Sequence, residues 1–190
     1  GVASGELLLF LNPDIRLGPG AIRALADEFA DGDVGVAGPP LEVEASGSVE
    51  HGATVDVIGS PVPLDRGARP LYVPGCALMT RSELFGELGG FDSRFFLFVE
   101  DVDYCWRVLL RGFDVRVPDI PPVWHQGGAV APGGYAGEGR LVSTTFRVAL
   151  RERNTLTTLL KCYGAPLACI LVPAYAVQSL ATAGVLAASG

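Results

Sequence analysis

Short apolar runs and helical periodicities alternate along the first 162 residues. Residues 6–11 contain the continuous apolar run LLLFL, which predicts a fully buried strand. Apolar residues recur at helical spacing from Ile22 to Phe29, between Gly18-Pro19-Gly20 and Gly32, so a helix is expected there. By the same criteria, further strands are expected at 34–37, 71–73, 77–80, 115–117 and 123–124, and further helices at 82–88, 100–111 and 140–162. This alternation predicts an α/β fold.

Two segments show neither a strand-like apolar run nor a helical periodicity. Residues 39–70 are rich in proline, glycine and serine and carry weak strand signals, so we expect a long excursion over the surface. Residues 126–139 contain six glycines, and this composition makes them a candidate lid over a binding site.

Residues 163–190 carry no charged side chain and are expected to form an apolar helical segment. A helix needs about 20 apolar residues to cross a bilayer, and this segment is long enough, although prolines interrupt it. Arg151, Arg153 and Lys161 lie just before it, and the positive-inside bias would then place the preceding domain in the cytoplasm. We therefore expect membrane insertion or membrane-surface packing, with a buried or amphipathic helix pair as the alternative.

Composition narrows the classes of function. The 190 residues suffice for one domain, or for most of one. A net charge of −7 and an isoelectric point near 4.8 argue against a nucleic-acid partner, because phosphate binding of that kind needs a basic face. The four cysteines show no C-x-x-C spacing, and we interpret them as reduced thiols of an intracellular protein.

Asn12-Pro13-Asp14 directly follows the first predicted strand. Pro13 ends the strand ladder, and Asp14 is then expected to project from the carboxyl end of the strand. The alternative is an ordinary turn, since Asn, Pro and Asp are all common turn formers. The uninterrupted apolar strand favours a site, because α/β proteins bind ligands in loops at strand ends.

Three acids, Glu100, Asp101 and Asp103, fall within four residues at the start of a predicted helix. One acid there is ordinary helix chemistry, because a carboxylate in the first turn interacts favourably with the helix dipole. Three acids repel one another unless a cation or a proton compensates. The phenylalanines that precede them lower the local dielectric, which would raise a carboxylate pKa toward that of a useful general base.

His125 is one of only two histidines, and it lies between a predicted strand and a Gly-Gly pair. A lone histidine is more often structural, but this position favours a site. The carboxylate of Asp14 and the imidazole of His125, both at strand ends, are suited to hold one divalent cation, Mg²⁺ or Mn²⁺. His51 lies in the polar excursion and is assigned no role.

Several motifs together resemble one family. They are LLLFLNPD at 7–14, Gly75-Cys76-Ala77 with Met79 and Arg81, GGFDSRFFLFVEDVDYCWR at 89–107, Gly112, His125, and Arg153-Asn154. In combination they resemble the inverting family 2 glycosyltransferases over about residues 5–162, and most closely the bacterial rhamnosyltransferase-like members.

The resemblance implies a GT-A fold, with a mixed sheet flanked by helices. Residues 1–162 would be the catalytic region without its N-terminal, nucleotide-gripping part, and residues 163–190 the apolar tail. A nucleotide-sugar donor and a divalent metal are implied as well. Asn12, Asp14 and Arg153 are then the expected donor-binding residues. Because Asn12 replaces the first acid of the family's D-x-D-type motif, one ligand charge is lost.

The same resemblance assigns the catalysis to a metal-dependent, hexosyltransferase-type enzyme of class EC 2.4. Glu100-Asp101 matches the family's E-D motif, Asp101 is similar to its catalytic base, and His125 stands where related transferases place a metal-binding histidine. Asp101 would deprotonate an acceptor hydroxyl that attacks the anomeric carbon with inversion, while the cation at Asp14 and His125 neutralises the leaving diphosphate. The expected acceptor is a glycan or lipid-linked glycan of the cell envelope, at the cytoplasmic face of the cell membrane.

Two other functions fit some of these residues. A non-catalytic sugar-binding or scaffold module would retain the fold without the N-terminal part that binds the donor nucleotide. The intact Asp14, Asp101 and His125 count against this alternative. A metal-dependent phosphohydrolase would need a second histidine in a usable context, which the sequence does not offer.

Overall fold

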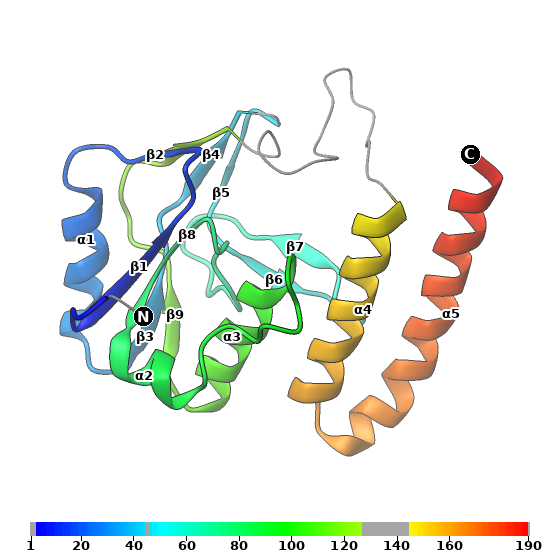
Figure 1. Cartoon of the computed structure of the whole chain (residues 1–190). Coiled ribbons are helices and arrows are strands. Elements are labelled where there is room, and N and C mark those ends of the chain that lie inside the picture. Colours follow the sequence, from blue (N-terminus) through cyan, green and yellow to red (C-terminus); the bar gives the residue numbers. More distant parts are fainter. Residues whose placement is uncertain (1–2, 45, 127–144, 190) are drawn as a thin grey trace.

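The computed structural model describes residues 3–44, 46–126 and 145–189. Its centre is a four-stranded mixed sheet with the strand order β1-β8-β3-β9 (Figure 1). β8 runs antiparallel to both β1 and β3, whereas β3 and β9 are parallel. The strands are β1 (Leu7–Leu11), β3 (Val34–Ala37), β8 (Ala77–Arg81) and β9 (Asp114–Arg116). This mixed sheet agrees with the expected α/β class.

A second four-stranded sheet has the order β2-β10-β4-β5. In it β10 lies between β2, to which it is antiparallel, and β4, to which it is parallel. Its strands are β2 (Ile15–Arg16), β4 (Leu41–Val43), β5 (Ser48–Glu50) and β10 (Val123–His125). A separate hairpin consists of β6 (Ala53–Val55) and β7 (Pro61–Pro63).

The surface excursion expected at 39–70 is therefore only partly correct. The segment supplies β4 to β7, and Leu41 is buried because β4 pairs with β10. Residues 71–73, expected to be a strand, contribute only a single bridge between Tyr72 and Ala53. The partner of β4, β10, is distant in sequence, and β5, β6 and β7 have only three residues each, so local pattern alone does not reveal these strands.

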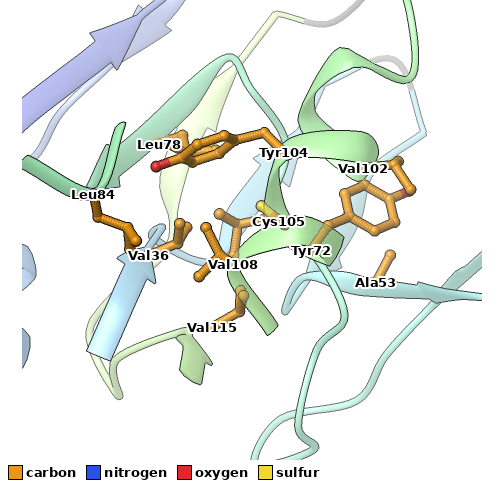
Figure 2. Packing of buried hydrophobic residues seen from close by; sticks show 11 residues of the cluster. Val36, Ala53, Tyr72, Leu78, Leu84, Val102, Tyr104, Cys105, Val108 and Val115 are labelled. Atoms are coloured by element: carbon orange, nitrogen blue, oxygen red, sulfur yellow. The ribbon is translucent and has the colours of Figure 1, made fainter. Parts of the chain in front are cut away.

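Hydrophobic burial places helices on both faces of the first sheet. Adjacent residues of β8 point to opposite faces. Met79 belongs to the buried cluster that contains Leu25 of α1. Leu78 belongs to the cluster that contains Cys105 of α3, which Figure 2 shows. The helices of these two layers are α1 (Ala21–Asp27) with the 3-10 turn η1 (Glu28–Ala30), α2 (Ser82–Glu87) and α3 (Glu100–Leu110).

The expected full burial of the first strand is wrong. β1 is an edge strand of the sheet as described, so its residues are half-buried and Leu11 is 44% exposed, instead of the strand being fully buried. Ile22 is exposed, because the buried side of α1 contains Ala21 and Leu25.

The chain ends in a helical hairpin of α4 (Thr145–Cys162) and α5 (Ala165–Ser189). α4 packs on α3, and α5 packs on α4 (Figure 1). Tyr175 of α5 is buried and donates a hydrogen bond of 2.8 Å to the Glu152 carboxylate of α4. Within the described part of the chain, no helix has the length and apolarity needed to cross a membrane. The candidate lid at 126–139 lies, except for Gln126, outside the described residues.

Candidate active site

A cavity of about 690 Å³ opens at the ends of β1 and β10, beside the start of α3 and one side of α4. Its lining includes most of the site residues predicted from sequence: Asn12, Asp14, Glu100, Asp101 and His125. These residues come from segments far apart in the chain, so the fold brings them together. Arg153 is the predicted site residue that does not line this cavity.

Asp14 and His125 lie side by side because β2 and β10 are paired. Asp14 directly precedes β2, and the partner of His125 in the ladder is Ile15. The distance from Asp14 Oδ2 to His125 Nε2 is 3.5 Å, and the two side chains are only 7% and 18% exposed, respectively. This is the close approach that a shared cation requires.

The surroundings of Asp14 fit a divalent cation. Its Oδ1 atom is buried and has no hydrogen-bond partner among the described residues, and an unsatisfied buried oxygen of a carboxylate is costly. The described residues contain no group of three or more His, Cys, Asp or Glu side chains placed to hold a metal. Asp14 and His125 supply two protein ligands, and a site with so few protein ligands is completed by phosphate oxygens and water, as is common for Mg²⁺.

Asp101 is held in the first turn of α3 by backbone hydrogen bonds. Its Oδ2 accepts from the Gly75 N–H and its Oδ1 from the Val102 N–H, each at 2.8 Å. A β-carbon at residue 75 would lie 3.3 Å from the Asp101 Cβ, so this close approach favours glycine there. Burial raises the pKa of Asp101, while the backbone hydrogen bonds oppose that rise. The carboxylate is thus both fixed in orientation and more basic than usual.

Glu100 is the second acid of the cavity. Burial, and then the neighbouring Asp101, raise its pKa to about 7. Its Oε2 atom is buried without a hydrogen-bond partner among the described residues. Near neutral pH the two adjacent carboxyl groups therefore carry less than two full negative charges, which reduces their repulsion.

Asp103, the third acid, is not part of the cavity. It is fully buried and pairs with Arg107 on its own helix at 2.8 Å and with Lys161 of α4 at 2.6 Å. The repulsion expected among three acids is relieved by these two cations. Asp103 therefore joins α3 to α4 instead of serving the site.

The loop before α3 has a strained backbone. Phe96, Phe98 and Val99 have φ angles of 62°, 69° and 70°, which non-glycine residues seldom adopt. Such a conformation persists only where surrounding contacts hold it. Because Glu100 follows directly, this loop sets the position of the acidic turn.

Asn154 of α4 supplies those contacts. Its side chain is completely buried, and its Nδ2 lies 2.9, 2.8 and 2.8 Å from the carbonyl oxygens of Phe95, Leu97 and Phe98. Sequence reasoning assigned no role to Asn154, and its only signal was membership of the Arg153-Asn154 motif. The structure makes it a positioning residue for the start of α3.

Arg153 supports the same loop from outside the cavity. Its guanidinium donates to the carbonyl oxygens of Arg94 at 2.7 Å and Phe95 at 3.3 Å. Its expected role as a donor contact remains a prediction. Among the described residues, the arginines that line the cavity are Arg147 and Arg151, which sequence reasoning did not select for the site.

Comparison with known proteins places these features in context. No family model matches the chain. It is 31% identical over 145 residues to N-acetylglucosaminyl-diphospho-decaprenol L-rhamnosyltransferase of Mycobacterium tuberculosis, covering 64% of this chain and 47% of the relative. It is 27% identical over 176 residues to the pre-mycofactocin glycosyltransferase of the same organism, covering 88% and 37%. The chain thus spans about half, or less, of the length of these curated relatives.

The fold has a match among solved structures. The crystal structure of GalNAc-T7 with UDP, GalNAc and Mn²⁺ is similar with a TM-score of 0.57 at 16% identity, over 82% of this chain and 31% of that one. At this identity the likeness concerns the fold alone. Together, the sequence relatives and the fold confirm the resemblance to the GT-A-like glycosyltransferases. The two Mycobacterium tuberculosis proteins and GalNAc-T7 are thus proteins that this chain resembles.

Proposed function

We propose that this protein transfers a sugar from a nucleotide-sugar donor to an acceptor hydroxyl, with inversion at the anomeric carbon. The observation that carries the proposal is the meeting in one cavity of the Asp14–His125 pair and the Glu100–Asp101 pair. The first pair suits a cation-bound diphosphate, and the second suits an acceptor hydroxyl. The names of the rhamnosyltransferase and glycosyltransferase relatives support sugar transfer, and the UDP of the GalNAc-T7 structure agrees with a nucleotide donor.

Asp101 acts as the general base in this proposal. Its carboxylate takes the proton of the acceptor hydroxyl while the hydroxyl oxygen bonds to the anomeric carbon and the bond to the diphosphate breaks. The hydrogen bonds from Gly75 and Val102 aim the carboxylate, and its raised pKa favours proton transfer. One displacement inverts the carbon. Glu100 contributes the second, partly protonated carboxyl group beside the base.

Asp14 and His125 would hold the divalent cation, with Asn12 lining the cavity at the same strand end. A carboxylate with an imidazole suits Mn²⁺ somewhat better than Mg²⁺. When bound, the cation supplies charge neutralisation for the leaving diphosphate. Asp14 Oδ1, which lacks a partner among the described residues, is the atom that gains most from it.

We further propose that the acceptor is a glycan or lipid-linked glycan of the cell envelope, reached at the cytoplasmic face of the membrane. The support is the lipid diphosphate in the name of the rhamnosyltransferase relative and the apolar residues that α5 exposes: Leu167, Ile170, Val177 and Leu180. Fractionation tests the location. Full-length protein that remains in the supernatant after a high-salt wash without detergent would contradict it.

The transfer itself is testable with full-length protein and a panel of nucleotide sugars. Product formed on a lipid-linked acceptor, with an inverted anomeric configuration by NMR and dependence on Asp101, would support the proposal. A product with retained configuration would reject the single displacement. Binding of nucleotide sugar with no transfer to any acceptor would favour the non-catalytic sugar-binding module instead.

A further inference from the structure

One side of α4 presents a cationic stripe to the cavity. Arg147, Arg151 and Thr155 all line it, and their spacing of four residues places them on one face of the helix. Two arginines one turn apart concentrate positive charge in a protein whose net charge is −7. The acidic residues of the cavity come from other elements, so the positive charge is confined to the α4 side, which suits an anionic ligand.

Both arginines lie over the same aromatic ring. The guanidinium carbons of Arg147 and Arg151 are 4.8 and 5.2 Å from the centre of the Phe98 ring. Stacking of this kind holds a guanidinium plane in place while its N–H groups point outward in that plane. Phe98 is itself fixed through its carbonyl oxygen by Asn154. The two cationic groups are therefore supported by an ordered platform.

The contacts of α4 place the arginines beside the base. Phe98, whose ring lies under both guanidinium groups, is three residues before Asp101. Helix α3, whose first turn contains Asp101, packs against α4. The Asp14–His125 pair comes instead from the paired strands β2 and β10. An acceptor that gives its hydroxyl to Asp101 from the α4 side therefore meets the arginines.

We propose that Arg147 and Arg151 bind a phosphoryl group carried by the acceptor, which is then a sugar phosphate or sugar diphosphate. This inference rests on the proposed function and names the acceptor class. Neighbouring guanidinium groups bind phosphate oxygens through paired, charge-assisted hydrogen bonds. A lipid-linked sugar diphosphate and a free sugar phosphate share this chemistry.

Calorimetric binding with the full-length protein in EDTA tests the proposal. EDTA removes divalent cations, so that Asp14 and His125 cannot hold a phosphate through one. The probes are inorganic pyrophosphate, a hexose 1-phosphate and farnesyl diphosphate. Each of Arg147→Gln and Arg151→Gln should weaken pyrophosphate binding by about ten-fold, while Arg151→Lys should weaken it less. The surface control Arg23→Gln should leave it unchanged, and Asp14→Asn, which removes a negative charge from the cavity, should not weaken it.

The comparison of probes identifies the source of the phosphate. Tighter binding of farnesyl diphosphate than of pyrophosphate supports a lipid-linked acceptor, and tighter binding of the hexose 1-phosphate supports a free sugar phosphate. Equal affinities for wild type and both glutamine variants would overturn the proposal. So would pyrophosphate binding that needs Mn²⁺ and is lost in Asp14→Asn, because the phosphate would then sit at the donor side.

A separate readout keeps the two proposals apart. Slow hydrolysis of the nucleotide sugar to water depends on the donor side of the cavity. If wild-type protein neither hydrolyses nor transfers any donor, the proposed function fails, whatever the binding data show. If wild-type protein transfers sugar and the arginine variants transfer it equally well to phosphorylated acceptors, only the phosphate subsite is wrong.

Discussion

The side-chain amide of Asn154 lies 2.8 Å from the carbonyl oxygen of Phe98. Through this contact, a helix late in the chain holds the loop that leads into the acidic start of α3. The loop contains three non-glycine residues with left-handed backbone conformation, so it needs such support. The position of Glu100 and Asp101 therefore depends on α4 as much as on α3.

Replacing Asn154 with alanine should impair both stability and turnover. Buried carbonyl oxygens lose their donor, at a cost of about 1–3 kcal/mol, and the loop is then free to relax away from the left-handed conformation. We expect kcat to fall while donor binding is retained, as measured by calorimetry alongside steady-state kinetics. Thr157→Ala, on the same helix, is the matched control. A lower melting temperature with unchanged kcat would show that Asn154 is only structural.

The variant Asp101→Asn keeps the size of the side chain but removes the base. Loss of a general base lowers rates by roughly 10²–10⁴-fold, so kcat should fall by that factor with little change in donor affinity. Glu87→Gln, an exposed acid on α2, serves as the control. Wild-type turnover by Asp101→Asn would remove this residue from the mechanism.

Asp14 and His125 should act together in cation binding. Even outer-shell partners of metal ligands change affinity by ~10–100-fold, so Asp14→Ala and His125→Ala should each weaken Mn²⁺ binding by about ten-fold or more. Electron paramagnetic resonance of Mn²⁺ with a nucleoside diphosphate measures this directly. His51→Ala is the control, because His51 lies at a different, smaller cavity. Equal Mn²⁺ binding by all three variants would refute the shared site.

Glu100 should make stability depend on pH. Its pKa is raised from 4.5 to about 7, mainly by burial, so the folded state holds a proton that the unfolded state has released between these values. The resulting stabilisation is complete below pH 4.5 and is lost as the pH rises to about 7. The variant Glu100→Gln lacks this loss and should gain stability relative to wild type over that range, by on the order of 3 kcal/mol. Chemical denaturation at several pH values measures the difference, and a constant difference would contradict the shift.

Asp103 should behave unlike Asp101, two residues before it. Removing one partner of a buried ion pair typically costs about 3–5 kcal/mol, so Asp103→Asn should unfold at a much lower denaturant concentration. At denaturant concentrations below its unfolding transition, however, the variant Asp103→Asn should keep a kcat near the wild-type value, because Asp103 does not line the cavity. A specific loss of kcat in folded protein would place Asp103 in the site after all.

Local pattern was sufficient for several elements. The apolar run at 7–11, the helix that starts at Glu100 and the acids of its first turn are all where the sequence predicts them. Asn12-Pro13-Asp14 likewise ends the strand it follows. These features depend on short-range periodicity and on the conformational limits of proline, so they can be recognised without knowledge of the partners.

Tertiary packing decided the rest. His125 reaches Asp14 only because β10 pairs with β2, and β4 is part of a sheet because it pairs with β10. Asp101 and Asp103 are both aspartates in the first turn of α3, yet Asp101 lines the cavity and Asp103 pairs with Lys161. The reason is that side chains two residues apart on a helix point in different directions. For the same reason Arg147 and Arg151 line the cavity while Arg153 supports a loop. Sequence alone determines which residues share a helix face, but only contacts between distant segments determine what that face meets.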